Sequence, residues 1–168
     1  MPMLEGPNPK RAENYLSLID HAVKIQGYLG GGTDGDVWKT SDDTAVKVFN
    51  YDFGYFNERD SYERLARFGF VEIIDGFWVP IMLGCNDDFM VVEMDLMQHA
   101  PYILDFAKVR IDRPPDFSDD VMQFHNEQGR ERFEHNWPAV QSLMSTLESI
   151  GIYYLDPQRG NITFPDML

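Results

Sequence analysis

The hydrophobic and polar positions in the first half of the chain predict short β-strands in hairpins. Runs of apolar and β-branched residues are bounded by Gly, Asp and Asn, and they predict strands at residues 23–29, 36–40, 44–49, 81–85 and 89–94. Residues 73–78 also have an extended pattern, which ends at Val79-Pro80. Short polar turns such as Ser41-Asp42-Asp43 join neighbouring strands. We therefore expect a five-stranded antiparallel sheet with one helix, in an α+β fold.

The helix within this region is predicted at residues 55–68, where apolar residues recur at helical spacing. Tyr55, Tyr62 and Leu65 share one face, and Glu58 lies on that same face. A carboxylate on a packing face needs a cation as its partner. A short helix is also predicted at residues 14–21, with Tyr15, Leu18 and Ile19 on one side, after a polar tail at residues 1–13.

The second half of the chain has a more helical pattern. Residues 95–117 contain three prolines and are expected to be irregular. Ser118 is a good N-cap for a helix through residues 119–136, which Gly129 could break. Residues 138–150 carry a clear i, i+3, i+4, i+7 apolar stripe, which predicts a core-facing helix that ends at Gly151.

Composition narrows the class of protein. The 168 residues include 14 basic and 28 acidic side chains, for a formal net charge of −14. That balance disfavours nucleic acid and anionic membranes as partners, since both attract clustered Lys and Arg. The N-terminus has no apolar stretch typical of a signal peptide, so a cytoplasmic location is expected. The single cysteine, Cys85, cannot form an internal disulfide and is expected to be a small core residue.

A glycine-rich turn lies between the first two predicted strands. Its sequence from Gly30 to Val37 has the spacing G-x-G-x-x-G-x-V, and glycines allow backbone N–H groups to approach phosphates closely. The alternatives are a dinucleotide-binding turn, which should open a helix rather than a strand, and an ordinary hairpin. Lys47 follows on the third strand; it is either a solvent-facing lysine or the partner of Glu58, aimed at phosphate oxygens.

A second candidate segment is the loop from Leu155 to Asn161, between the last helix and a short strand. Asp156 could accept a hydroxyl proton, and the amide oxygen of Asn161 could ligate magnesium. The alternative is turn chemistry, because Asp-Pro and Gly-Asn pairs are common in loops.

Taken together, these segments resemble the protein kinase-like family over residues 23–164. The resemblance rests on the glycine turn, on Ala45-Val46-Lys47, on Glu58 and on the pair Asp156 and Asn161. It implies that ATP binds with Mg²⁺ between two lobes, with Lys47, Glu58 and Asp156 as the catalytic group. It further implies that Val92 is the gatekeeper, that the backbone of Glu93 and Asp95 contacts adenine, and that the nucleotide contacts Gly30, Gly31, Gly32, Gly35, Val37, Ala45 and Lys47.

The resemblance also divides the chain. Residues 1–22 would be a tail with a short helix, residues 23–94 a kinase-like N-lobe, and residues 95–168 a hinge and a truncated helical C-lobe. The family's D-F-G segment, which carries a magnesium-binding aspartate, does not follow Asn161. Asp166 is the candidate to replace that aspartate.

Three functions remain open on this basis. The chain is a minimal phosphotransferase that moves the ATP γ-phosphate to a hydroxyl, a pseudokinase that acts as a binding or regulatory module, or a fragment of a longer kinase. Gln158 replaces the catalytic-loop lysine of many protein kinases. A truncated C-lobe would leave apolar surface exposed, which a protein partner or a homodimer would cover.

Overall fold

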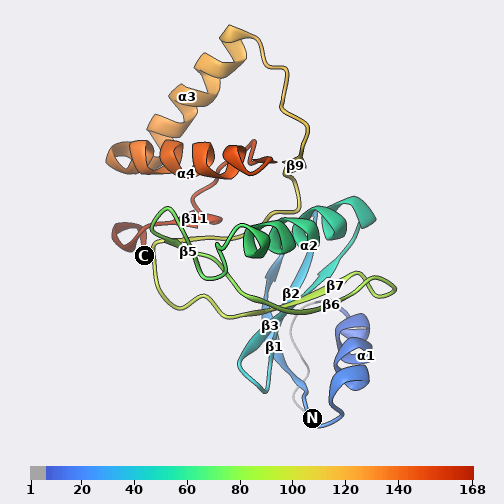
Figure 1. Ribbon diagram of the computed structural model, residues 1–168. Coiled ribbons are helices and arrows are strands. Elements are labelled where there is room, and N and C mark those ends of the chain that lie inside the picture. Colours follow the sequence, from blue (N-terminus) through green and yellow to red (C-terminus); the bar gives the residue numbers. More distant parts are fainter. Residues whose placement is uncertain (1–6) are drawn as a thin grey trace.

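The computed structural model describes residues 7–168, which form an α+β fold with three sheets and four α-helices. Figure 1 shows the largest sheet at one end of the molecule. Helices α3 (Asp119–Phe133) and α4 (Trp137–Ser149) lie at the other end, and short strands lie between. One continuous core cluster extends from Ala45 to Phe164 and therefore joins the two ends.

The largest sheet confirms the predicted five-stranded antiparallel arrangement. Every pair of neighbouring strands is antiparallel. The central strand, β3, is buried along nearly its whole length, which fits its apolar sequence. The strands lie in the order β1 (Ile25–Gly31), β2 (Gly35–Thr40), β3 (Thr44–Phe49), β7 (Val91–Asp95) and β6 (Met82–Asn86).

Helices α1 (Lys10–Ile19) and α2 (Asp52–Arg67) pack against this sheet in two separate core clusters. Val46 and Val48 belong to the cluster that contains α1, whereas Ala45 and Phe49 belong to the one that contains α2. Successive strand residues point to opposite faces of a sheet. Lys47 therefore points toward α2.

The first helix differs from the prediction for residues 14–21. It begins at Lys10, so the last residues of the predicted tail are helical, and residues 1–6 of that tail lie outside the described residues. Its buried face consists of Ala12, Tyr15 and Leu16, while Leu18 and Ile19 are exposed. The prediction that Leu18 and Ile19 lie on the packing face is therefore wrong. The face that packs against the sheet is the one that carries Ala12, Tyr15 and Leu16.

Residues 73–78 and 95–117 also differ from prediction. The first segment is a tight hairpin of β4 (Ile73–Ile74) and β5 (Phe77–Trp78), whose turn has Asp75 and Gly76 at positive φ. The second segment contains β8 (Tyr102–Ile103) and β9 (Arg110–Ile111). They complete two small sheets, one of order β11-β8-β5-β4 with β11 at Ile162–Thr163, and one that pairs β9 with β10 at Ile152–Tyr153.

The two C-terminal helices are largely as predicted. The Ser118 side chain accepts a hydrogen bond from the Val121 N–H at the start of α3. The apolar stripe of α4 is buried at Val140, Leu143 and Leu147. Helix α3 continues through Gly129 without a break. A Cβ at this position would lie 2.2 Å from the Trp137 ring. The glycine instead lets the two helices approach each other.

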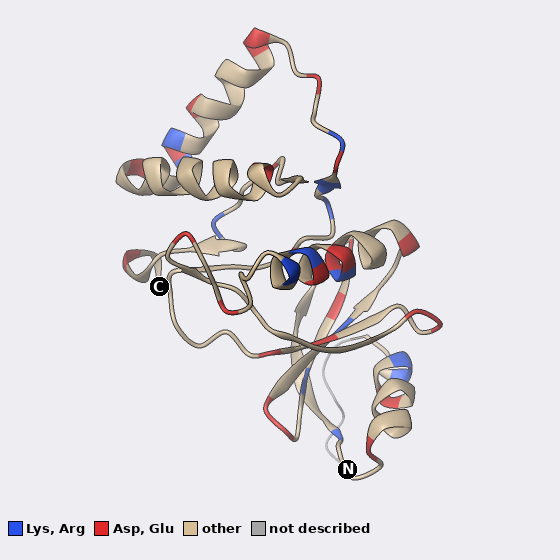
Figure 2. Cartoon of the chain, in the orientation of Figure 1, with Lys and Arg blue, Asp and Glu red and all other residues tan. Residues whose placement is uncertain are grey.

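Three further features concern the surface charge, the cysteine and the length of the helices. Figure 2 shows basic and acidic residues interleaved along α2. Cys85 is exposed on β6, so the prediction that it is a core residue is wrong; it lies on the edge strand of the sheet. Among the described residues, none of the helices combines the length and apolar character needed to cross a lipid bilayer.

Candidate functional site

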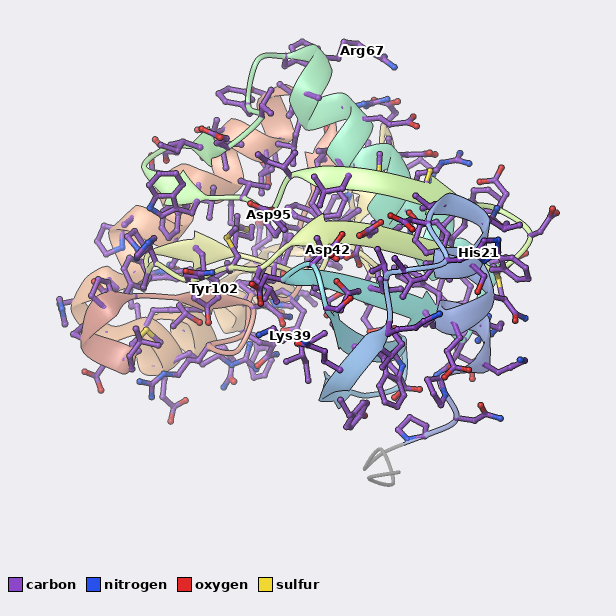
Figure 3. The ribbon with its side chains drawn as sticks, turned by 90° about the horizontal axis from the view of Figure 1, so that it is seen from below. His21, Lys39, Asp42, Arg67, Asp95 and Tyr102 are labelled. Atoms are coloured by element: carbon purple, nitrogen blue, oxygen red, sulfur yellow. The ribbon has the colours of Figure 1, made fainter. Side chains whose placement is uncertain are left out.

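A cavity of about 510 Å³, which we call the main cavity, adjoins the glycine turn. It lies beneath the glycine turn (residues 30–35) and is bounded by β3, α2, the segment after β7 and the ends of β8 and β11. Figure 3 labels two of its lining residues, Asp95 and Tyr102, where the large sheet meets the C-terminal elements. The predicted site residues that line it are Gly30, Gly31, Gly32, Gly35, Val37, Ala45, Lys47, Glu58, Asp95 and Asn161.

The glycines of the turn are not equivalent. A Cβ on Gly35 would lie 2.1 Å from the Val48 carbonyl oxygen of the neighbouring strand β3. A Cβ on Gly31 would lie 2.2 Å from a carboxylate oxygen of Asp36. Gly32 has open space around it. Gly31 and Gly35 are therefore required by packing within the turn, whereas Gly32 leaves space for a ligand.

Lys47 lies at the bottom of the main cavity and is held by two carboxylates. Its Nζ donates to Glu58 Oε2 at 2.6 Å and to Asp105 Oδ1 at 3.2 Å. The predicted Lys47–Glu58 pair is thus present, and Glu58 is almost fully buried on α2. We call these three residues the buried cluster.

The protonation of Lys47 follows from this arrangement. Burial alone would lower the pKa of Lys47, but the charges of Glu58 and Asp105 outweigh burial and raise the pKa above its ordinary value. Lys47 is therefore an ammonium ion at neutral pH. Tyr62 also donates its hydroxyl to Glu58, at 3.4 Å, which fixes the carboxylate from a second side.

Sequence reasoning missed Asp105, the third member of the buried cluster. It has a φ of 64°, an uncommon conformation for a residue other than glycine, and its Oδ1 also accepts the Ala107 N–H at 3.2 Å. Its sequence signal is the apolar strand Tyr102-Ile103-Leu104 followed by Asp-Phe. We expected such a segment after Asn161, and the chain places it before the two long helices instead.

Strand pairing brings Asp105 and Asn161 into the same region. Strands β8 and β11 are antiparallel, with Ile103 opposite Ile162, and the Leu104 N–H donates to the Asn161 carbonyl at 2.7 Å. Asp105 comes two residues after the end of β8, and Asn161 comes directly before β11. Both residues line the main cavity, with one carboxylate and one amide side chain. Such oxygen ligands suit Mg²⁺ when phosphates and water complete its coordination.

Asp156 lies next to this region. It lines a smaller cavity of about 150 Å³, the side cavity, together with Asp105, Asn161 and Lys108. Its Oδ1 accepts a hydrogen bond from Arg132 Nη1 of α3 at 3.0 Å, and its side chain is 61% exposed. We call Arg132 and Asp156 the exposed pair. Because the two cavities share Asp105 and Asn161, Asp156 lies in the cavity that adjoins the candidate phosphate region.

Two residues expected to contact a base do not line the main cavity. Val92 is buried in the core, and the Glu93 carboxylate accepts hydrogen bonds from Tyr15 and Thr44 in the region of α1. The cavity is lined instead by Met94, Asp95, Leu96 and Met97. Val92 and Met94 share one face of β7, so the wall of the cavity lies two residues further along the strand than expected.

Asp166 is not part of either cavity. It lies in a short 3-10 helix at Pro165–Met167, where its carboxylate accepts hydrogen bonds from Asn136 and lies 3.1 Å from His135 Nε2. Asp105, rather than Asp166, is the aspartate that lines both cavities together with Asn161. Among residues 7–168, no group of three or more His, Cys, Asp or Glu side chains is arranged to hold a metal ion.

Comparison of the chain with models of known protein families gives no match, and comparison with curated protein sequences gives none either. The interpretation of the site therefore depends on the geometry of its residues.

Proposed function

We propose that this protein binds ATP together with Mg²⁺ in the main cavity and transfers the terminal phosphate to a hydroxyl group. The observation that carries the proposal is the position of Lys47. It lies between Glu58 and Asp105, in a cavity that Asn161 also lines, beneath a glycine turn. A fixed cation next to oxygen ligands for magnesium is the arrangement that phosphoryl transfer requires, since catalysis there is mainly positioning and charge stabilisation.

Each side chain then has a stated role. Lys47 binds oxygens of the α- and β-phosphates, and Glu58 keeps its ammonium in place. Asp105 and Asn161 would hold Mg²⁺, which would supply positive charge to neutralise the phosphates. Asp156 orients the acceptor hydroxyl and accepts its proton as the oxygen attacks the terminal phosphorus. The bond to the β-phosphate oxygen breaks, and ADP leaves.

The apolar part of the cavity suits a purine base. Val37, Ala45 and Met94 provide flat apolar walls. Among hydrogen bonds between described residues, none uses the backbone of Leu96 or Met97. These two backbones are thus available to pair with the base edge.

These roles match those of the protein kinase-like family, with one difference in chain order. In that family the magnesium-binding aspartate follows the asparagine, whereas Asp105 precedes Asn161 here. The binding-only alternative, a pseudokinase, drew its main support from a missing aspartate. Asp105 removes that support.

The first test is calorimetric titration of ATP with Mg²⁺ into the wild type, Asp105→Asn and Asp75→Asn. Asp75 is the matched control, because it too is an aspartate at positive φ, and it lines neither cavity. We expect Asp105→Asn to weaken binding by about 10- to 100-fold, the usual effect of losing one charged contact, and Asp75→Asn to have no effect. A wild type that does not bind ATP would overturn the proposal.

The second test concerns chemistry. ADP release from Mg·ATP, with water as acceptor, should exceed that of Lys47→Met, and Asp156→Asn should abolish it without weakening ATP binding. Turnover that survives Asp156→Asn would remove Asp156 from its role. Tight binding with no turnover above the Lys47→Met background would favour the pseudokinase.

A further inference from the structure

Lys108 lies at the junction of the two cavities. It lines the side cavity with Asp156 and Asn161. Its Nζ is 3.4 Å from Asp34 Oδ2 and 3.5 Å from Thr33 Oγ1, both on the glycine turn. Asp34 lines the main cavity. The ammonium of Lys108 thus connects the glycine turn with the walls of the side cavity.

The charges around the two cavities are unbalanced. Lys47 and Lys108 are the only Lys or Arg residues among those that line them, while five carboxylates do so: Asp34, Glu58, Asp95, Asp105 and Asp156. Lys47 is already engaged by two of these carboxylates. A phosphate in the side cavity would meet Asp105 and Asp156, and Gln158 on the same wall is neutral. A cation is needed there; Lys108 lines this cavity, whereas Arg132 lies at its edge and is held by Asp156 and the Pro157 carbonyl.

Lys108 is also free to change partner. Its side chain is 67% exposed, its stem is flexible, and its contact with Asp34 is long for an ion pair. Exposed ion pairs of this kind contribute little to stability. Exchanging the Asp34 carboxylate for a phosphate therefore costs little, whereas Lys47, at 9% exposed and held by two carboxylates, cannot move.

We propose that Lys108 binds the terminal phosphate of the nucleotide and makes the site select a triphosphate over a diphosphate. This rests on the proposed function, since it presumes a nucleotide with Mg²⁺ in the main cavity. A phosphate chain that starts at Lys47 and passes Asp105 and Asn161 brings only its last phosphate into the side cavity. Lys108 then leaves Asp34 and binds that phosphate, which draws the segment that carries Asp105 and Lys108 onto the ligand.

The experiment compares ATP with ADP, each with Mg²⁺, by calorimetry on the wild type, Lys108→Met and Lys39→Met. Lys39 is the matched control, because it also forms one surface ion pair, with Asp43, and it lines neither cavity. We expect Lys108→Met to weaken ATP binding by about 10- to 30-fold and ADP binding by less than about twofold. Lys39→Met should change neither affinity.

A further variant, Asp34→Asn, removes the carboxylate that competes for Lys108, and we expect it to strengthen ATP binding by a few fold. An ATP affinity that Lys108→Met leaves unchanged, or equal losses for ATP and ADP, would overturn the assignment of Lys108 while the proposed function stands. A wild type that binds neither nucleotide would instead overturn the proposed function.

Discussion

The candidate site contains two ion pairs of opposite character. In the buried cluster, Glu58 is 1% exposed and lies 2.6 Å from Lys47, which Asp105 contacts from another side. In the exposed pair, Asp156 is 61% exposed and has a single cation, Arg132, at 3.0 Å. The first is a part of the protein core and has one arrangement. The second is in contact with solvent and can exchange its partner, which is what the role proposed for Asp156 would require.

Alkaline pH should have the largest effect on the free energy of unfolding, and it acts through Lys47 and the buried tyrosines near it. Burial and the nearby charge of Glu58 raise the pKa of Tyr62, and burial with the nearby charge of Asp105 raises that of Tyr154. The pKa of Lys47 is also raised. The folded protein therefore keeps three protons that the unfolded chain releases above about pH 10.

Because these pKa values are raised, the protein should become less stable as the pH rises. Groups whose folded pKa is raised contribute stability that is complete below the unfolded pKa and is lost as the pH rises toward the folded one. Each contributes up to about 1.4 kcal/mol per pH unit, so Lys47, Tyr62 and Tyr154 together should lower the free energy of unfolding by up to about 4 kcal/mol per unit. Tyr15, Tyr28 and Tyr55, whose pKa values are also raised, add to this slope. Urea unfolding at about pH 8 and pH 11 measures it. Tyr62→Phe should reduce the slope, and an unchanged slope would show that Tyr62 ionises normally.

Removing one carboxylate from each pair compares them directly. Glu58→Ala leaves a buried ammonium with one partner fewer and should lower the free energy of unfolding by about 3 kcal/mol. Asp156→Ala should change it by less than about 1 kcal/mol, because Asp156 is exposed. Urea unfolding at neutral pH gives both values. Similar losses in the two variants would mean that the pairs do not differ as their burial indicates.

The glycine turn gives a finer comparison within one short segment. Gly35→Ala should cost about 1 to 3 kcal/mol of stability, because the new Cβ would collide with the Val48 carbonyl. Gly32→Ala should be nearly neutral, since nothing lies near its Cβ position. Thermal unfolding of both variants measures the difference. If Gly32→Ala were the more destabilising, the turn would be packed differently from the structure described above.

Much of the fold could be predicted from local pattern. The five antiparallel strands, the buried face of α2 and the pairing of Lys47 with Glu58 all depend on residues close in sequence or on simple periodicity. The small strands β8 and β9 could not be predicted in the same way, because two-residue strands carry no periodic signal. Their partners lie far along the chain.

The residues of the candidate site also fall into those that local pattern predicts and those that depend on pairing between distant strands. The glycine turn and Lys47 belong to one meander, so their proximity follows from hairpin geometry. Asp105 could not be placed near Asn161 without knowing that β8 pairs with β11. Met94 was missed for a different reason: the resemblance assigned Val92 and the backbone of Glu93 and Asp95, whereas the residue of that face of β7 that lines the cavity is Met94, two residues after Val92.

The pairing of β8 with β11 also means that the candidate metal site joins two segments that are far apart in the sequence. Asp105 and Asn161 are the two ends of a long excursion of the chain that contains both α3 and α4. The β8–β11 pairing already holds the two ends of this segment together in the folded protein. A ligand that binds both Asp105 and Asn161 would therefore stabilise the pairing against local unfolding. Occupancy of the cavity and the integrity of the two helices would thus be linked.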